Sequence, residues 1–597
     1  MNAALALFTY ELRAKSRLFI GCAVLAVVPF LATLLPSARG NARDVVAMVG
    51  GFLAIIIGLT IAAMMSRAAI VNELVERRMS FWFAKPIRPA ALWLGKASAA
   101  LVTSVLCFTM IAVPAMLFAG PAWKHLWTDG PPVLAAAAFG MVWLFLLGHT
   151  VNTVTRSRSL LLALDFCFLL IAAGALVLIA RPVLLGGGTA VLKRLVFAIV
   201  GGLLVVAAIA PVWQLRHGRA DIRRSHAAFS RFFWPCIGVI LLLAGGYVAW
   251  LVSATPGDLR EILEVAQPPR GPKVLVTGNP ANRGDYHATF IIDTATGRYD
   301  RVSTPPWWGL ESSKDGKTFA WLQPSGGFRA RQLELYVNGR ATGILTSLSS
   351  RMVLSDDGTR LATDSGSTVT VYDVATGRIA GSAAGFDPRS QASMYFVTSD
   401  LLRIIETTPL RIAELDLRTR RLTRTESPLP AAPRNGLTVS GDGTRMFLRG
   451  KNMIVDARSG TILAALEPAR YNVASMLHDG SVVAAASANG TAHVHIYGPG
   501  GEHRHELTLP ETPGLWITGE VEGGKVLLAT RRGMLVVDVN RGTIVRRVDG
   551  VRGPMPRFSA DPRLIRYAAD QELVGRTEDG KLVVWKHEGR AEARPLL

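Results

Sequence analysis

The sequence is poor in cysteine. Its 597 residues include four cysteines, Cys22, Cys107, Cys167 and Cys236, and all four lie inside apolar runs in the first half of the chain. A disulfide framework or a cysteine-based zinc site would need paired cysteines in a soluble region. Neither is indicated here.

Catalytic motifs are missing as well. No stretch matches the complete Walker A pattern Gly-x-x-x-x-Gly-Lys-Ser/Thr, and the glycine-rich residues 186–193 lack its Gly-Lys-Ser/Thr ending. The HExxH pattern of zinc proteases and the GxSxG pattern of α/β hydrolases are also absent. We therefore expect no enzymatic activity, no ATP hydrolysis and no bound cofactor in this chain.

Histidines offer one possible metal site. His493 and His495 precede the Gly498–Gly501 turn, and His503 and His505 follow it. A two-residue turn at Pro499-Gly500 would pair His495 with Arg504 and put the two histidine pairs on opposite faces of the hairpin. A four-histidine site would need a one-residue register slip. We therefore expect ordinary surface histidines and no metal.

The bulk composition divides the chain in two. It is 50% hydrophobic, with a mean hydropathy of +0.31 and a net charge of +21. Residues before about Ser253 are rich in apolar runs, whereas the later residues are rich in Gly, Thr, Asp and Arg. In a chain with such runs the positive excess indicates membrane topology, and no nucleic-acid partner is expected.

The N-terminal half contains seven apolar runs of near bilayer length, which predict a polytopic α-helical membrane domain. They cover residues 18–35, 45–66, 97–119, 132–151, 160–180, 191–213 and 233–252. We expect the first run to remain as a span, because a long charged stretch precedes it and further spans follow at once. Arg181-Pro182 and three glycines interrupt the chain between the fifth and sixth runs, so residues 181–194 form either an external loop or a re-entrant element.

Basic residues alternate between the connections. The N-terminus and the loops near residues 67–96, 156–158 and 216–231 carry most of the Lys and Arg, which the positive-inside rule places in the cytoplasm. With seven spans, everything after Val252 then lies outside. Two polar residues fall within the runs, His149 and Asp165, and intramembrane ionisable groups are functional candidates. A structural pair that ties this hairpin together is the alternative.

A charged loop separates the second and third runs. Its candidate functional residues are Glu73, Glu76, Arg77, Arg78, Phe81, Trp82, Lys85, Pro86, Arg88, Gly95 and Lys96. The first four continue a helical end, and Pro86 and Pro89 break the helix, giving a stiff, charged protrusion. The aromatic cap at residues 81–83 needs a partner or a membrane surface. An interfacial hairpin anchored in lipid headgroups is the alternative.

Residues 1–214 resemble the permeases of ABC-2-type transporters. The likeness lies in the amphipathic residues 7–13, two spans, the acidic–basic–apolar loop with Lys85-Pro86-Ile87 and Gly95-Lys96, and four further spans. The resemblance implies an exporter in a bacterial-type inner membrane, paired with a second or related permease. It also implies that the loop couples to a separate ABC ATP-binding subunit, which holds ATP and Mg. A seventh span departs from the family pattern.

The C-terminal half is a repeat array. Ser355-Asp356-Asp357-Gly358 is echoed at residues 313–316 and 440–443, and an Asp-x-x-x-Gly element recurs at residues 293–297, 373–377, 456–460 and 538–542. A spacing of about 40 residues is that of a four-stranded propeller blade. The array resembles WD40-like or YVTN-type β-propellers of seven or eight blades, without the Trp-Asp signature.

These patterns predict four regions: an ABC-2-like transmembrane domain at residues 1–214, a basic cytoplasmic connector and seventh helix at 215–253, a linker at 254–272 with a short helix near 259–265, and an extracytoplasmic propeller at 273–597. The expected function is that of an ABC-2 permease, in contact with membrane lipid, whose propeller binds an unidentified external ligand. The alternatives are a membrane-anchored propeller that acts as a sensor, receptor or scaffold without transport, and an enzyme with its active site in the propeller funnel.

Overall fold

The computed structural model divides into two compact units, which are described separately. A helical unit comprises Met1–Ala180 and Lys193–Val248, and a second unit comprises Arg181–Leu192 and Ala249–Leu597. The structure describes all residues except 1–2, 35–40, 77, 86, 129–132, 158–160, 186–188, 219–220, 303–305, 307, 326–331, 348–350, 388–391, 408–409, 427–435, 467–470, 489–490, 510–514, 553–560, 578, 590–591 and 597.

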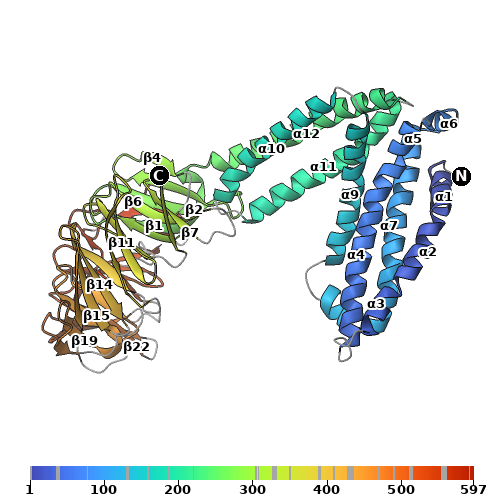
Figure 1. The fold of residues 1–597 in the computed structure, drawn as a ribbon. Helices are drawn as coiled ribbons and strands as arrows, with labels where there is room; N and C mark the ends of the chain where they lie inside the picture. The colour runs from blue at the N-terminus through green and yellow to red at the C-terminus, as the bar shows by residue number, and fades with distance from the viewer. Residues whose placement is uncertain are drawn as a thin grey trace. The chain divides into compact units, whose positions relative to one another are not determined.

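The first half of the chain is helical (Figure 1). Its helices are α1 (Ala3–Ala14), α2 (Ser16–Leu25), α3 (Val28–Leu31), α4 (Ala42–Ala69), α5 (Val71–Val75), α6 (Met79–Phe83), α7 (Pro89–Ala119), α8 (Pro121–Trp123), α9 (Val133–Arg156), α10 (Leu161–Leu185), α11 (Thr189–Gly218) and α12 (Ile222–Val252). Short helical turns, η1 (Ala32–Leu34) and η3 (Lys124–Thr128), follow α3 and α8.

Among the residues that the structure describes, seven helical segments are long and apolar enough to cross a membrane, as the sequence predicts. They are Ser16–Leu34, Ala42–Val75, Pro89–Ala119, Val133–Arg156, Leu161–Leu184, Ala190–Gly218 and Ile222–Val252. Several are longer than the apolar runs that predict them, because charged residues at their ends also take up helical conformation. Most of the basic connector is therefore helical and belongs to α11 and α12.

The described part of residues 181–194 is helical too. Arg181 and Pro182 lie inside α10, and α11 begins at Thr189. Proline removes one backbone donor from the last turn of α10, and the helix ends at Leu185. The predicted interruption is therefore a helix end, not a long loop.

Small residues let the central helices pack closely. A Cβ added at Gly50 of α4 would lie 2.4 Å from the Cβ of Ala115 in α7, and one added at Gly58 would lie 2.4 Å from Met141 of α9. Glycine and alanine at these contacts let the helices pack more closely than larger residues would allow. Helices α4, α7 and α9 form the core of this unit, with α1 and α2 along α7 (Figure 1).

The second half is an eight-bladed β-propeller of antiparallel sheets. The first four blades are β1–β4 (Leu259–Ala266, Lys273–Pro280, Ala288–Asp293, Tyr299–Val302), β5–β8 (Trp308–Ser312, Phe319–Ser325, Gln332–Val337, Arg340–Ser347), β9–β12 (Arg351–Leu354, Arg360–Asp364, Thr368–Asp373, Ile379–Ala384) and β13–β16 (Ser393–Thr398, Leu401–Thr407, Leu410–Asp416, Arg421–Glu426).

The last four blades are β17–β20 (Leu437–Val439, Arg445–Leu448, Met453–Asp456, Ile462–Ala465), β21–β24 (Val473–Met476, Val482–Ala488, Thr491–Tyr497, His503–Leu509), β25–β28 (Trp516–Val521, Lys525–Ala529, Gly533–Asp538, Thr543–Asp549) and β29 (Val551–Arg552) with β31–β33 (Leu573–Thr577, Leu582–Trp585, Arg594–Pro595). The propeller therefore has eight blades, the larger of the two numbers that the sequence predicts.

The repeated Ser-x-Asp-Gly element is the turn between the first and second strands of a blade. In the second blade, Asp315 Oδ1 accepts hydrogen bonds from the Ser313 hydroxyl at 2.7 Å and from the Lys317 N–H at 3.1 Å, and Gly316 has a φ of +68°. Burial alone would raise the pKa of Asp315, but these hydrogen bonds outweigh it and lower the pKa to about 2. The same bonds recur at Asp357 and Asp442.

The Asp-x-x-x-Gly element is the turn between the third and fourth strands. Asp293 Oδ1 accepts the N–H groups of Ala295 and Thr296, and Gly297 has a φ of +69°. The fourth blade has Arg420 at the glycine position, with a φ of +55°. Its side chain must therefore tolerate a left-handed backbone that favours glycine.

One prediction is wrong: the stretch near residues 259–265 is strand β1, not a helix in a linker. Two β-bulges, between Leu259 and Glu261 and between Ile262 and Glu264, interrupt its pairing with β2. The bulges break the strict alternation of a strand, so that Leu259, Ile262 and Val265 all face inward. A spacing of three between buried residues resembles helical periodicity, and the propeller begins before residue 273.

A second correction concerns the histidine hairpin between β23 and β24. The closing hydrogen bonds run from the Gly498 N–H to the Glu502 carbonyl and from the Gly501 N–H to the Gly498 carbonyl, so the loop is longer than two residues. A bulge follows, and His495 pairs with Glu506 instead of Arg504. A positive-φ glycine, here Gly501, with an adjacent bulge is characteristic of three-residue hairpin loops.

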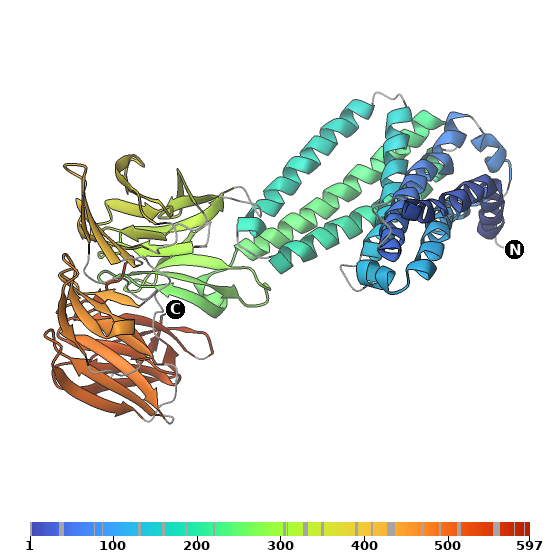
Figure 2. The ribbon, with the colours of Figure 1, turned by 60° about the horizontal axis from the view of Figure 1, so that its bottom comes forward.

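The blades follow one another around a ring in chain order, from green through yellow to red (Figure 2). Side chains join the first blade to the last. The Gln267 amide nitrogen donates to the Glu572 carbonyl at 2.5 Å, and its oxygen accepts the Val574 N–H at 2.8 Å. Strand β30 (Arg566–Tyr567) leaves the last blade and pairs in parallel with β25. Apart from β30, the seventh blade and the last blade each consist of their own consecutive strands.

Candidate functional site

The charged loop after α4 folds into two short helices. Glu73 lies in α5, and Phe81 and Trp82 lie in α6. Lys96 lies in the second turn of α7. Proline at position 89 begins α7, where its missing N–H costs nothing. Two predicted residues, Arg77 and Pro86, lie outside the described residues.

Lys96 is buried at the centre of this region. Its side chain is 2% exposed, and its Nζ lies 2.6 Å from Glu11 Oε1 and 2.8 Å from Glu73 Oε1. The two carboxylates come from α1 and α5, so one ammonium group joins three helices. An ammonium group taken out of water needs such paired carboxylates.

Trp82 belongs to the same cluster. Its Nε1 donates to Glu73 Oε2 at 2.8 Å, the Tyr10 ring packs edge-on against it at 6.4 Å, and the Lys96 ammonium lies 5.2 Å from its ring centre. Trp82 is therefore partly enclosed, in contrast to the exposed aromatic cap that the sequence predicts. Phe81 remains 57% exposed, with the Lys85 ammonium 4.3 Å from its ring centre.

Gly95 permits the approach of α1 to α7. A Cβ at this position would lie 2.8 Å from both the Ala4 carbonyl oxygen and the Leu7 Cβ. No larger residue fits without moving α1. The glycine therefore serves the packing that brings Glu11 to Lys96.

The predicted loop residues thus separate into two groups. Glu73, Trp82, Gly95 and Lys96 form an internal cluster, together with Glu11, which sequence reasoning missed. The exposed residues are Glu76, Arg78, Phe81, Lys85 and Arg88, which we call the coupling surface after the role that the sequence predicts for the loop. A signal for Glu11 was present, because an acidic residue on the amphipathic N-terminal segment needs a cation once that segment packs.

The two polar candidates within the long apolar helices, His149 and Asp165, have different partners. Asp165 of α10 accepts the Trp234 Nε1–H at 2.6 Å and lies 2.6 Å from His226 Nε2, both from α12. His149 of α9 is fully buried against Trp93 of α7, with ring centres 5.0 Å apart. The proposed pairing of His149 with Asp165 is therefore wrong, and Asp165 instead ties α10 to α12.

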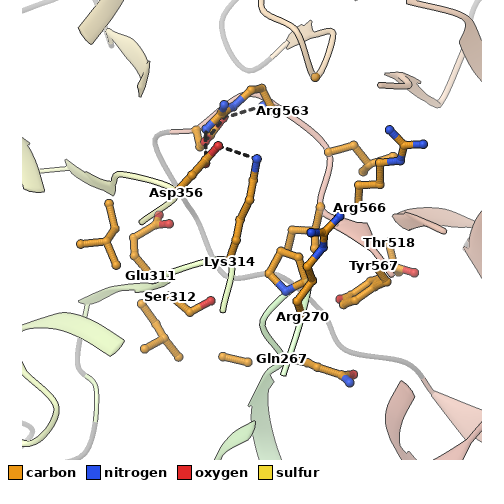
Figure 3. A pocket seen from close by; sticks show the side chains of 18 of the residues that line it. Gln267, Arg270, Glu311, Ser312, Lys314, Asp356, Thr518, Arg563, Arg566 and Tyr567 are labelled. Atoms are coloured by element: carbon orange, nitrogen blue, oxygen red, sulfur yellow. Dashed lines mark hydrogen bonds and ion pairs between the residues drawn. The ribbon is translucent and has the colours of Figure 1, made fainter. Parts of the chain in front are cut away.

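The propeller contains a cavity of about 540 Å³ lined by the innermost strands (Figure 3). Lys314, Asp356, Gly441 and His478 line it from four different blades, and each follows the first strand of its blade. In the first three of these turns the residue occupies the variable position of the Ser-x-Asp-Gly element. The repeated turn therefore fixes where these lining residues lie, while the residue type at that position differs from blade to blade.

Arg563 closes one side of this cavity. Its guanidinium lies 2.6 Å from Asp561 Oδ2 and 3.3 Å from Asp356 Oδ1, and it donates to the Phe396 carbonyl at 3.0 Å. Burial alone would lower the pKa of Arg563, but the two neighbouring carboxylates outweigh this effect and raise the pKa above its usual value. Arg563 thereby links the segment before β30 to the third and fourth blades.

The other basic groups of the cavity are also paired. Lys314 bonds to Asp356, as drawn in Figure 3, and Arg270 Nη2 lies 2.7 Å from Glu522 Oε1. Arg566 Nε lies 3.5 Å from Glu520 Oε1. Each of these basic groups thus has a carboxylate partner, which favours a polar ligand over a strongly anionic one.

Comparison with known proteins gives no functional assignment. No protein-family model matches the chain, and no curated protein does so significantly. A crystal structure described as the eukaryotic initiation factor is similar over 56% of this chain and 86% of its own, with 11% identity and a TM-score of 0.37.

Proposed function

We propose that this protein is the membrane-spanning subunit of an ABC-2-type exporter and that its coupling surface binds a separate ABC ATP-binding subunit. ATP and Mg are bound and hydrolysed on that partner. The chain itself supplies the permease, paired with a second or related copy in a bacterial-type inner membrane. The predicted domain limits and the extracytoplasmic propeller are parts of the same proposal.

The observation that carries the proposal is the Lys96 cluster. A loop that only anchors a hairpin in lipid headgroups needs no internal fastening. Here a buried ammonium group joins the loop at Glu73 to α1 at Glu11 and to α7. A force applied to the coupling surface would therefore reach three helices at once.

The chemistry of the coupling surface suits a protein partner. Phe81 offers a large exposed ring with the Lys85 ammonium 4.3 Å from its centre, and Arg88 is exposed on the same loop. Aromatic residues are enriched in protein interfaces, whose rims are polar. Glu76 and Arg78 form an exposed ion pair at 3.0 Å on the same loop.

The composition of α10 supports a membrane environment. Only 6% of its most apolar window is buried within the protein. Large apolar side chains on all its faces are exposed, among them Phe166, Leu170 and Leu178. A helix that is apolar all round is stable in lipid or against another apolar helix.

A second candidate function is that of a sensor, favoured by the propeller cavity. Residues from several blades meet around about 540 Å³, enough for a small polar ligand. In this alternative the helices anchor a receptor and no ATPase binds. In the transport proposal the same cavity lies outside the membrane and binds substrate or partner.

Co-purification of the full chain from native membranes tests the proposal. The wild type should carry with it a Walker A-containing subunit and vanadate-sensitive ATP hydrolysis. Phe81→Asp combined with Lys85→Glu should lose both. Arg43→Glu, an exposed reversal at the opposite end of α4, should retain both. Equal retention by the two variants would refute the coupling assignment, and absence of any ATPase from the wild type would favour the sensor.

A further inference from the structure

The outer half of the sixth blade gathers histidines on one face. In the β23–β24 pairing, Ile496 lies opposite His505, but the next pair is Tyr497 with His503, because a bulge at this point skips one residue. A skip of one residue moves the following side chain to the other face of the strand. His503 therefore joins His495 and Glu506 on the same face.

His505 stays on the opposite face. Its ring nitrogen Nε2 lies 2.9 Å from the Asn540 carbonyl oxygen in the neighbouring blade. It also packs against Gly542, where an added Cβ would lie 2.5 Å from the His505 ring. The hairpin thus separates one structural histidine from the other three.

The spacing of the gathered groups suits a transition metal. His495 Nδ1 and His503 Nε2 lie 3.4 Å apart, and ligand atoms of His495, His503 and Glu506 all lie within 4.8 Å of one another. A tetrahedral zinc ion with bonds of about 2.0–2.2 Å separates its ligand atoms by about 3.3–3.6 Å. The histidine pair already has this separation, and a side-chain rotation of Glu506 completes the set.

The surroundings hold these ligands in place. His493 Nδ1 lies 3.0 Å from Glu506 Oε1, the contact by which an outer histidine orients a metal-binding carboxylate. The rings of Tyr471 and Tyr497 pack against His495 and His503 at 5.8 Å and 5.2 Å. The nearby Arg504 bonds to Glu502 at 2.6 Å, so its charge is largely neutralised.

We propose that His495, His503 and Glu506 form a zinc site on the outer strands of the sixth blade. His493 acts as a positioning residue for Glu506, and water completes the coordination. Two imidazoles and one carboxylate are a typical ligand set for Zn²⁺ with an open position. Because Glu506 and His503 are exposed, the site exchanges its metal with solvent. This proposal stands independently of the transport function.

Metal titration of the full chain in detergent tests the site. After treatment with a chelator, the wild type should bind one Zn²⁺ by calorimetry, and Co²⁺ should give the visible absorption of a tetrahedral site. His495→Ala and His503→Ala should each weaken binding at least about 100-fold, and His493→Gln about tenfold. His505→Gln is the matched control and should bind as the wild type does.

Three results would overturn the proposal. They are the absence of zinc binding by the wild type, retention of binding by the His495→Ala/His503→Ala double variant, and equal loss in His505→Gln. The first would leave the 3.4 Å contact as a hydrogen bond between two histidines. Glu506→Gln, which keeps the shape of the hairpin, separates ligand loss from misfolding, and metal-free melting temperatures should agree for all variants.

Discussion

Each unit contains a cation that joins several of its own elements: Lys96, which is buried, and Arg563, whose side chain is 12% exposed. Lys96 in the helical unit lies between Glu11 and Glu73, which come from two other helices. Arg563 in the propeller lies between Asp356, from another blade, and Asp561, its own neighbour in sequence. Lysine acts as a point charge that needs both carboxylates, whereas the arginine fork also bonds to a backbone carbonyl. The helical cluster therefore depends on the single ammonium nitrogen of Lys96, whereas more than one nitrogen of the Arg563 guanidinium takes part in the propeller contacts.

The largest effect is expected for Lys96→Met. Removal of the ammonium group leaves two partly buried carboxylates facing each other, which costs about 3 to 5 kcal/mol. Unfolding of the full chain in detergent measures this loss. A triple variant that adds Glu11→Gln and Glu73→Gln should recover part of it, and no recovery would mean that Lys96 acts through its alkyl chain alone.

A smaller loss is expected for Arg563→Met. Its closest carboxylate lies beside it in the chain, so removal of the guanidinium releases fewer constraints, and the loss of charged hydrogen bonds costs about 1.5 to 3 kcal/mol. Unfolding of the propeller followed by circular dichroism checks the value. Arg458→Met, at a side chain that is 76% exposed, should change stability by less than about 0.5 kcal/mol. A loss at Arg563 larger than that at Lys96 would reverse the comparison.

The propeller should gain stability from Arg420→Gly. Arg420 has a φ of +55° at a position where four other blades have glycine, which adopts this backbone conformation without strain. The expected gain is about 1 kcal/mol. Gly377→Arg, at the equivalent turn, should lose a similar amount. If Arg420→Gly destabilises the protein, the side chain makes a contact that outweighs the strain.

The smallest effect is expected on the stability of the propeller at low pH. The folded pKa of Asp315 is lowered from 3.8 to about 2, so its contribution to stability is complete above about pH 4 and is lost as the pH falls toward 2. The pKa values of Asp357 and Asp442 are lowered in the same direction. Melting temperatures between pH 5 and pH 2 should therefore fall, less steeply in Asp315→Asn. An unchanged slope in that variant would contradict this account.

Local chemistry made much of the fold predictable. Apolar runs near bilayer length correspond to the seven long helices, and the Asp-Gly turns with the Asp-x-x-x-Gly elements predict the blades. These patterns depend only on residues that are close together in the sequence. The sequence pattern of β1 predicts a helix instead of a strand, because the two bulges of β1 give its buried residues a helical spacing.

The candidate sites depend on contacts that a sequence does not display. Glu11 and Lys96 are 85 positions apart, and their pairing requires Gly95 to admit α1. The partners of Asp165 lie on α12, more than 60 positions later. The histidine face of β23–β24 depends on a single bulge, so a standard two-residue turn gives the opposite arrangement.

The most direct test of the central claim is photocross-linking from the coupling surface. A photoreactive phenylalanine analogue at position 81 of the full chain, irradiated in native membranes, should cross-link to an ATP-binding subunit that carries a Walker A motif. The same analogue at position 43, at the other end of α4, should not. Cross-links from position 81 to lipid alone would contradict the account and leave the loop as an interfacial anchor.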